Sequence, residues 1–370
     1  MRKMIHILCR SAWRLFLLML LTGTTVSAQE FKSKLNLNRE FPATRESTLE
    51  IENKYGKIQV VSWEKELVVV DVEIRVTESS ESKLDKLKDD ISIDFTGTKS
   101  YIMVKSNFKS ESGRLASELK SVSHTLSGSN KNVEINYMIK VPSYMDVVLI
   151  NKFGDIYLDD LSGDVEIELS NGALKANRLD GNTNITLSFA TGMIETLEST
   201  TLNLAYSDLT LGEAGQLDVT SKSSKLNADS INVLKINSRR DKLYFKKVEY
   251  LYGESNFTEI WIYDFLRETD LDLKYGKLTI ENVMPAFSRI NIESEFTDVT
   301  LLFDKQCRFD FDILYHEKAL VKLPEPIGDT KESAQGEAHL RSTGSWGGDQ
   351  PASRITIDAL QKCYINLSIK

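Results

Sequence analysis

The feature that most constrains the fold is a motif that restarts about every 18 residues between Asn151 and Leu302. Each pass has a short alternating apolar run, a tight turn of small or polar residues, and an apolar anchor that opens the next run. The anchors are Ile156, Leu174, Ile194, Leu209, Leu226, Leu243, Ile260, Leu278 and Val299. The repeats share a spacing and a pattern of residue types but few identical residues. Such a period predicts a solenoid, in which each coil buries its apolar face only against neighbouring coils.

Within each repeat, apolar residues alternate with polar ones. Val165, Ile167 and Leu169, for example, are separated by Glu166 and Glu168. Period two, with β-branched and aromatic residues, indicates half-buried strands rather than helices. The sequence therefore predicts an all-β protein, a β-solenoid with coils of about 17 to 18 residues and irregular capping segments at both ends.

Two positions in the repeat carry polar or small residues. The second residue before the anchor is usually small, as in Gly154 and Gly276, which suits a sharp turn or a positive φ. Five residues before the anchor, alternation points short polar side chains inward, where they either hydrogen-bond along the axis or occupy a bend. These inward positions are Asn151, Ser221, Ser238, Ser255 and Ser294.

Aromatic residues recur three positions before the anchor. They are Phe153, Tyr206, Phe257, Tyr275 and Phe296. We expect them to form a stack inside the core, and the alternative is a platform for a ligand.

The first 28 residues have the pattern of an export signal. Arg2 and Lys3 precede an apolar run, and Val26-Ser-Ala28 resembles a cleavage site. We therefore expect an exported bacterial protein, in the periplasm or on the outer surface, with no permanent transmembrane segment. Removal of the signal leaves 42 basic and 54 acidic residues, a net charge of −12. This balance argues against nucleic acid as a partner.

Composition and pattern divide the remaining chain into three blocks. Residues 29–132 form a β-rich segment that begins the solenoid, with a short helix near 82–90 and a Ser-rich loop near 109–131. Residues 133–303 hold the regular repeats, and residues 304–370 supply the last coils and capping strands.

No residues form a recognisable catalytic, cofactor or metal motif. His124, His316 and His339 lack partners at metal-ligand spacing, and the chain has no nucleotide-binding or nucleophile motif. We therefore expect no cofactor and no enzyme activity. Cys307 and Cys363 both fall at inward positions of their strands, so they form either a disulfide that ties the last coils or two buried free thiols.

One motif occurs twice, as Asn53-Lys-Tyr-Gly-Lys-Ile58 and Asn151-Lys-Phe-Gly-Asp-Ile156. Together with Leu161-Ser-Gly-Asp-Val165, it resembles the bacterial putative-adhesin family of exported single-stranded β-solenoids, over about residues 48–302. The resemblance implies a right-handed β-helix with an adhesin-like role, and it supplies no catalytic residue.

The leading hypothesis is a non-enzymatic cell-envelope protein that binds a protein or glycan partner. One alternative is an envelope-sensing component that works with a membrane anti-sigma regulator, and another is a β-helix polysaccharide lyase or hydrolase. The candidate binding surface comprises the Trp346 loop and the outward residues at the turns, namely Asp155, Asp208, Lys225, Lys242, Glu259, Lys277 and Asp298. Their mixed sign favours recognition by shape and aromatic contacts over charge.

Overall fold

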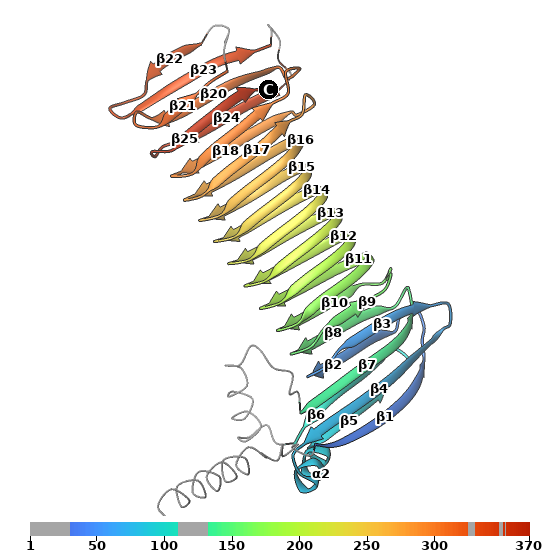
Figure 1. Cartoon of the computed structure of the whole chain (residues 1–370). Helices are drawn as coiled ribbons and strands as arrows, with labels where there is room; N and C mark the ends of the chain where they lie inside the picture. Colours follow the sequence, from blue (N-terminus) through green and yellow to red (C-terminus); the bar gives the residue numbers. More distant parts are fainter. Residues whose placement is uncertain (1–29, 110–131, 325–329, 348–350, 352) are drawn as a thin grey trace, which may run out of the picture.

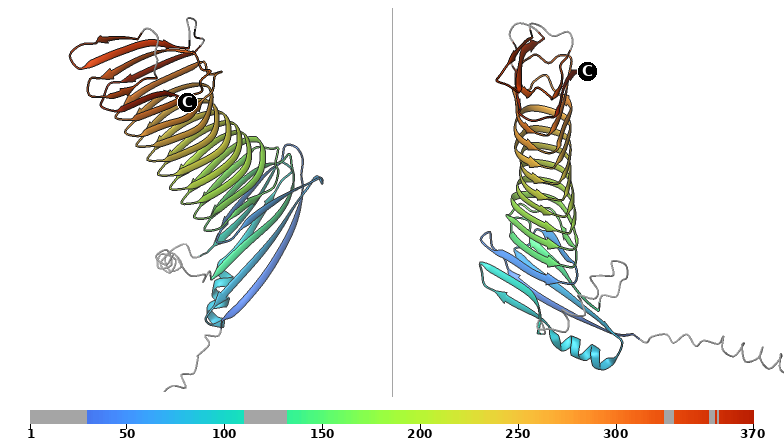
Figure 2. Two further views of the ribbon diagram at one scale, coloured as in Figure 1. Left: turned by 45° about the horizontal axis from the view of Figure 1, so that its top comes forward. Right: turned by 90° about the vertical axis from the view of Figure 1, so that its left-hand side faces the viewer.

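The computed structural model describes residues 30–109, 132–324, 330–347, 351 and 353–370. Parallel strands stack coil upon coil into one long sheet system, so the predicted β-solenoid is confirmed (Figure 1). In the right-hand view of Figure 2 the stacked coils form a narrow column, which widens at the N-terminal cap. The predicted export signal and nearly all of the Ser-rich loop lie outside the described residues.

The regular part is built from long strands, each of which bends around most of one coil. They pair in parallel with the next coil, and inward apolar residues alternate with outward polar ones. The strands are β11 (Ala173–Ser188), β12 (Thr191–Ala205), β13 (Asp208–Lys222), β14 (Lys225–Arg239), β15 (Lys242–Asn256) and β16 (Glu259–Lys274). Two residues, such as Tyr206 and Ser207, make the turn between consecutive strands.

The first coils interleave segments that are distant in sequence. β2 (Thr48–Lys54) pairs with β8 (Asp146–Lys152), and β3 (Ile58–Trp63) pairs with β9 (Ile156–Leu158), so the two copies of the repeated motif lie side by side. β10 (Val165–Ser170) then joins β8 to β11.

The N-terminal cap is built from the strand before the first motif copy and from the chain between the two copies. Two of its strands pair in parallel with the first coil, the outer strands add antiparallel pairs, and Leu84 and Leu87 of a short helix are buried against them. The elements are β1 (Phe31–Pro42), β4 (Leu67–Glu78), α2 (Glu81–Asp90), β5 (Ile91–Gly97), β6 (Tyr101–Phe108) and β7 (Val133–Pro142).

The C-terminal end changes from regular coils to a mixed cap. β20 pairs with β24 in parallel and with β23 antiparallel, which closes one side of the stack. The elements are β17 (Lys277–Val283), β18 (Arg289–Glu295), β19 (Asp298–Phe303), β20 (Phe309–His316), β21 (Leu320–Lys322), β22 (Lys331–Ala334), β23 (His339–Trp346), β24 (Ser353–Ala359) and β25 (Tyr364–Ile369).

The anchor alignment holds through the regular coils except at one coil. Leu226, Leu243 and Ile260 lie in register and are buried, as the period predicts. In the third coil, however, Gly192 rather than Ile194 pairs with Leu174 and Leu209. The anchor predicted for that coil is therefore wrong by two residues.

The small residues before the anchors lie in the turns, as predicted, but they do not take the positive φ that was the alternative. The positive φ lies one residue earlier, at 58° for Phe153, and Gly154 has no positive φ. A Cβ on Gly154 would meet the carbonyl oxygen of Gly56 at 1.8 Å, so close stacking of the turns requires glycine there. In later coils the side chain at this position instead accepts a hydrogen bond from the preceding turn, as Ser207 Oγ does from the Ala190 backbone N–H at 3.1 Å.

Candidate functional site

The turns form a continuous edge along the solenoid, and an aromatic row runs down it. The predicted internal aromatic stack is wrong, because these side chains are between 43% and 62% exposed. The exposed members are Phe153, Phe189, Tyr206, Phe257, Tyr275 and Phe296, and the partly buried Tyr55 precedes them. We call this row, together with Asn171, Ser223 and Arg240 at the same position, the turn ladder.

Backbone conformation explains why the rings point outward. Every member of the turn ladder has a positive φ, between 51° and 67°. A residue in this left-handed conformation reverses the chain within one step, which places its side chain on the outside of the bend and the next residue inside. The alternation of the incoming strand is therefore broken at the turn. Non-glycine residues rarely adopt this conformation, so ten of them in one row is an unusual arrangement.

The rings stack face to face along the axis. Phe189 and Tyr206 have ring centroids 5.0 Å apart with planes 5° from parallel, and Phe257 and Tyr275 are 4.9 Å apart at 8°. The run continues from Tyr275 to Phe296 at 5.1 Å, and Tyr55 stacks on Phe153 at 5.6 Å. These distances follow the rise of about 4.8 Å between paired strands.

Two gaps interrupt the row of rings within the turn ladder, at positions where the residue is not aromatic. Asn171 separates Phe153 from Phe189, and Ser223 with Arg240 separates Tyr206 from Phe257. At the second gap cations lie over the neighbouring rings. Lys222 Nζ is 5.9 Å from the Tyr206 ring centroid, and the Arg240 guanidinium carbon is 6.0 Å from that of Phe257.

The predicted outward residues flank the turn ladder but divide into two kinds. Asp155 Oδ1 accepts from the Ala173 backbone N–H at 2.9 Å, and Asp298 Oδ1 accepts from that of Tyr364 at 2.8 Å, so both connect neighbouring coils. Exposed side chains without such a bond lie between them. These are Asp208, Lys225, Lys242, Glu259 and Lys277, which stack in register in that order.

Trp346 lies away from this edge, on β23 opposite Phe309. Its side chain is half-buried and packs against the core of the C-terminal cap. The structure therefore does not bring the Trp346 loop together with the turn residues.

Cys307 and Cys363 are separate buried thiols in this structure. Cys307 Sγ contacts the Val283 carbonyl oxygen at 3.2 Å. Burial raises the pKa of Cys307 to about 12 and that of Cys363 to about 11, so both thiols are protonated at neutral pH.

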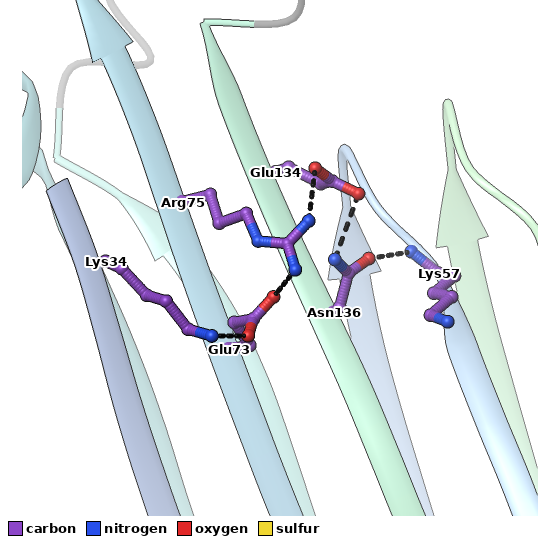
Figure 3. A network of polar contacts seen from close by, with 6 residues as sticks. All are labelled: Lys34, Lys57, Glu73, Arg75, Glu134 and Asn136. Atoms are coloured by element: carbon purple, nitrogen blue, oxygen red, sulfur yellow. Dashed lines mark hydrogen bonds and ion pairs between the residues drawn. The ribbon is translucent and has the colours of Figure 1, made fainter. Parts of the chain in front are cut away.

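A hollow of about 570 Å³ on the N-terminal cap is lined by residues of β1, β4 and β7 and by Lys57. Figure 3 shows the polar contacts there: Glu73 pairs with Lys34 and Arg75, and Arg75 pairs with Glu134 at 3.7 Å. The hydrogen bond from Lys34 holds the pKa of Glu73 below its usual range. This network ties β1, β4 and β7 together.

In the described part of the chain, no group of three or more His, Cys, Asp or Glu side chains is placed to hold a metal ion. Among the helices described, none is long and apolar enough to cross a membrane.

No protein-family model and no curated protein matches the chain. Among solved structures, two are similar to the chain. A putative cell adhesion protein from Clostridium sporogenes is 12% identical with a TM-score of 0.21, covering 92% of this chain and 100% of its own. A putative adhesin from Bacteroides fragilis is 14% identical with a TM-score of 0.33, covering 68% of this chain and 98% of its own.

Sequence reasoning missed several residues of this edge. Phe189 was overlooked because its coil was misaligned by two residues. Lys222, Arg239 and Arg240 are also exposed, but the repeat pattern points to only one outward residue per turn. The sequence signal that reveals them is the number of basic residues in the whole turn, from the last residue of one strand to the first residue of the next.

Proposed function

We propose that this chain is a non-enzymatic, exported cell-envelope protein whose solenoid binds a protein or glycan partner along the turn ladder. The observation that carries the proposal is the row of half-exposed rings on successive coils. Contiguous exposed apolar surface of this kind is typical of interaction sites, because it gains stability when another molecule covers it.

The architecture suits distributed recognition. Each coil contributes one turn-ladder residue and one or two flanking polar side chains, and the stack holds them at a constant spacing. A partner that follows the axis would contact several coils at once, so affinity would come from many modest contacts rather than from one indispensable residue.

The test compares ring removal at the turn ladder with ring removal elsewhere. The double variant Phe257→Ser and Tyr275→Ser removes two stacked rings, whereas Tyr263→Ser removes an exposed ring on a flat face. We expect an envelope extract to leave a bound component on the immobilised wild-type chain and on Tyr263→Ser, but not on the double variant. Equal capture by all three would refute the proposed surface.

Two further measurements test the rest of the proposal. The purified chain should show no turnover on a panel of polysaccharides and esters. Cleavage abolished by one carboxylate substitution in a folded variant would instead establish an enzyme. Protein recovered from the envelope should begin at Gln29, and a retained Met1 in the membrane pellet would contradict export by signal cleavage.

A further inference from the structure

Five exposed cations gather around the second gap in the turn ladder. They belong to two successive turns of the solenoid, on coils that pair directly. We call them the basic cluster, and they are Lys222, Lys225, Arg239, Arg240 and Lys242. The chain as a whole carries a net charge of −8, so this concentration of positive charge is opposite in sign to its average.

The basic cluster places like charges directly next to each other. Lys222 lies in register with Arg239, and Lys225 lies in register with Lys242. Directly opposed like charges on neighbouring strands destabilise a sheet. Two such pairs at one place cost folding stability, and an arrangement of that kind is typical of a functional site.

The one carboxylate in the two turns that carry the cluster, Asp241, is buried and accepts hydrogen bonds from backbone N–H groups and serine hydroxyls rather than from the five cationic side chains. Within the described residues none of the five cations forms an ion pair, whereas nearby Lys235 and Lys246 pair with Asp218 and Asp229 at 3.6 and 2.6 Å. The charge of the cluster is therefore available to a molecule from outside.

The local shape provides space for such a molecule. Tyr206 and Arg240 are two coils apart, which is roughly 10 Å along the axis. The small side chain of Ser223 lies between them and leaves space for about one ring. On the next coils a hollow of about 350 Å³ is lined by three cations, Arg240, Lys242 and Lys277, and by Phe257, together with the carboxylates Asp241 and Glu259. An exposed aromatic side chain borders each side of the cluster, with Tyr206 49% and Phe257 52% exposed.

We infer that the basic cluster is the binding site for an acidic sugar residue of a glycan, a pyranose bearing a carboxylate or a sulfate. This inference rests on the proposed function and names the class of ligand. The anionic group lies at the Ser223 gap, where Lys222 and Arg240 flank it and the guanidinium can bind two of its oxygens. The apolar C–H groups of the sugar pack against the exposed edge of the Tyr206 or Phe257 ring, because the ring faces are covered by stacked rings and by Lys222 and Arg240.

Two features favour a sugar over a nucleic acid or an acidic peptide. The turn residues Asp208 and Glu259 bound the cluster on its two sides, so it accommodates one or two negative groups rather than a continuous polyanion. The adjoining Tyr206 and Phe257 rings are rigid and apolar, and Tyr206 also carries a hydroxyl, which suits a sugar ring with apolar C–H groups and polar substituents.

Binding of defined trisaccharides to the full chain tests the inference. Trigalacturonate and sulfated galactotriose represent the two sources of negative charge, and unmodified galactotriose is the neutral match. We expect either or both acidic sugars to bind, with affinity falling as salt rises, and the neutral sugar to bind at least about tenfold more weakly. Whichever acidic sugar binds more tightly identifies the charged group.

Matched charge reversals locate the site. Lys222→Glu should weaken acidic-sugar binding about tenfold or more while keeping or raising the melting temperature, because it converts the like pair with Arg239 into an opposite pair. Lys175→Glu, an exposed lysine of an earlier coil without a described ion pair, should leave binding unchanged. Equal affinity of the wild type and Lys222→Glu would place the ligand elsewhere.

The remaining outcomes separate the inference from the proposed function. Equally tight binding of triglutamate or of an oligothymidylate would overturn the assignment to a sugar. If no acidic sugar binds while ring removal still abolishes envelope capture, the inference fails and the proposed function stands. If ring removal has no effect on capture, the proposed function fails as well.

Discussion

The Asp241 side chain accepts a hydrogen bond from the backbone N–H of Ser224, one coil away, at 2.7 Å. The same buried carboxylate also accepts from the hydroxyls of Ser221 and Ser238, both at 2.6 Å, and from the Arg239 N–H at 2.9 Å. Four donors compensate the loss of hydration that burial imposes on the charge. This carboxylate therefore joins neighbouring turns of the solenoid.

Replacing Asp241 should destabilise the protein. Asp241→Ala leaves several buried donors without a partner, and we expect the free energy of unfolding to fall by about 3 kcal/mol. Asp208→Ala, an exposed turn carboxylate, is the control and should change it by less than about 0.5 kcal/mol. Urea denaturation followed by circular dichroism measures both. Similar midpoints would show that the carboxylate is not structural.

The register of the coils predicts opposite responses at adjacent residues. Leu243 is buried between Leu226 and Ile260, whereas Lys242 faces solvent. Leu243→Asp should lower stability by several kcal/mol, because it buries an unpaired charge, and Lys242→Asp should cost little. Thermal unfolding distinguishes the two. Equal melting temperatures would contradict the alignment of these coils.

Close stacking of the turns should make Gly154 intolerant of a side chain. In Gly154→Ala the new Cβ would lie 1.8 Å from the Gly56 carbonyl oxygen, and backbone on both coils would have to move. In Gly192→Ala the nearest atom is a terminal methyl of Leu209 at 2.5 Å, which can rotate away. We expect the first variant to lose roughly 1–3 kcal/mol more stability than the second in the same unfolding assay. A larger loss of stability in Gly192→Ala than in Gly154→Ala would contradict the explanation from backbone contact.

The two cysteines should be unreactive in the folded protein. Their raised pKa values keep both thiols neutral at pH 8. In the chain from Gln29 onward, which lacks Cys9, a thiol reagent should modify them slowly until urea is added, and then titrate two thiols. Since folding raises these pKa values from 9.0 to about 12 and about 11, the stability contribution is complete below pH 9. It should be lost as pH rises from about 9 towards 11 and 12. Absence of reactive thiol after unfolding would indicate a disulfide.

Filling the gap in the turn ladder should separate stability from binding. Ser223→Tyr adds a ring between Tyr206 and the Arg240 guanidinium, which hold a similar φ, so stacking on Tyr206 should maintain stability or raise it by about 0.5–1.5 kcal/mol. The new ring should also occupy the interval between Tyr206 and Arg240 and weaken trigalacturonate binding. Asn171→Tyr fills the other gap and should leave that binding intact. Calorimetry on both variants checks this, and unchanged affinity in Ser223→Tyr would exclude the gap as the binding position.

The sequence determined the strand period, the approximate coil length and most of the register. These properties are local, because alternation sets which side of a strand is apolar and the period sets which residues meet in the next coil. Leu226, Leu243 and Ile260 could therefore be placed in the core from spacing alone. The inward polar positions, such as Ser221 and Asn151, followed from the same alternation and are buried.

The tertiary structure decided what happens at the turns. One residue per coil in the left-handed conformation changes which side chains face outward. Its position cannot be predicted from residue type, because Phe153, Ser223 and Arg240 all adopt this conformation. Stacking of distant segments then decided the rest. It paired Asn53 with Asn151, and it brought Lys222 beside Arg239, so that a mixed series of charges along the chain became a cluster of one sign in space. Alternation along a strand is encoded locally, but the reversal of the chain and the lateral contacts between coils arise only when the coils pack.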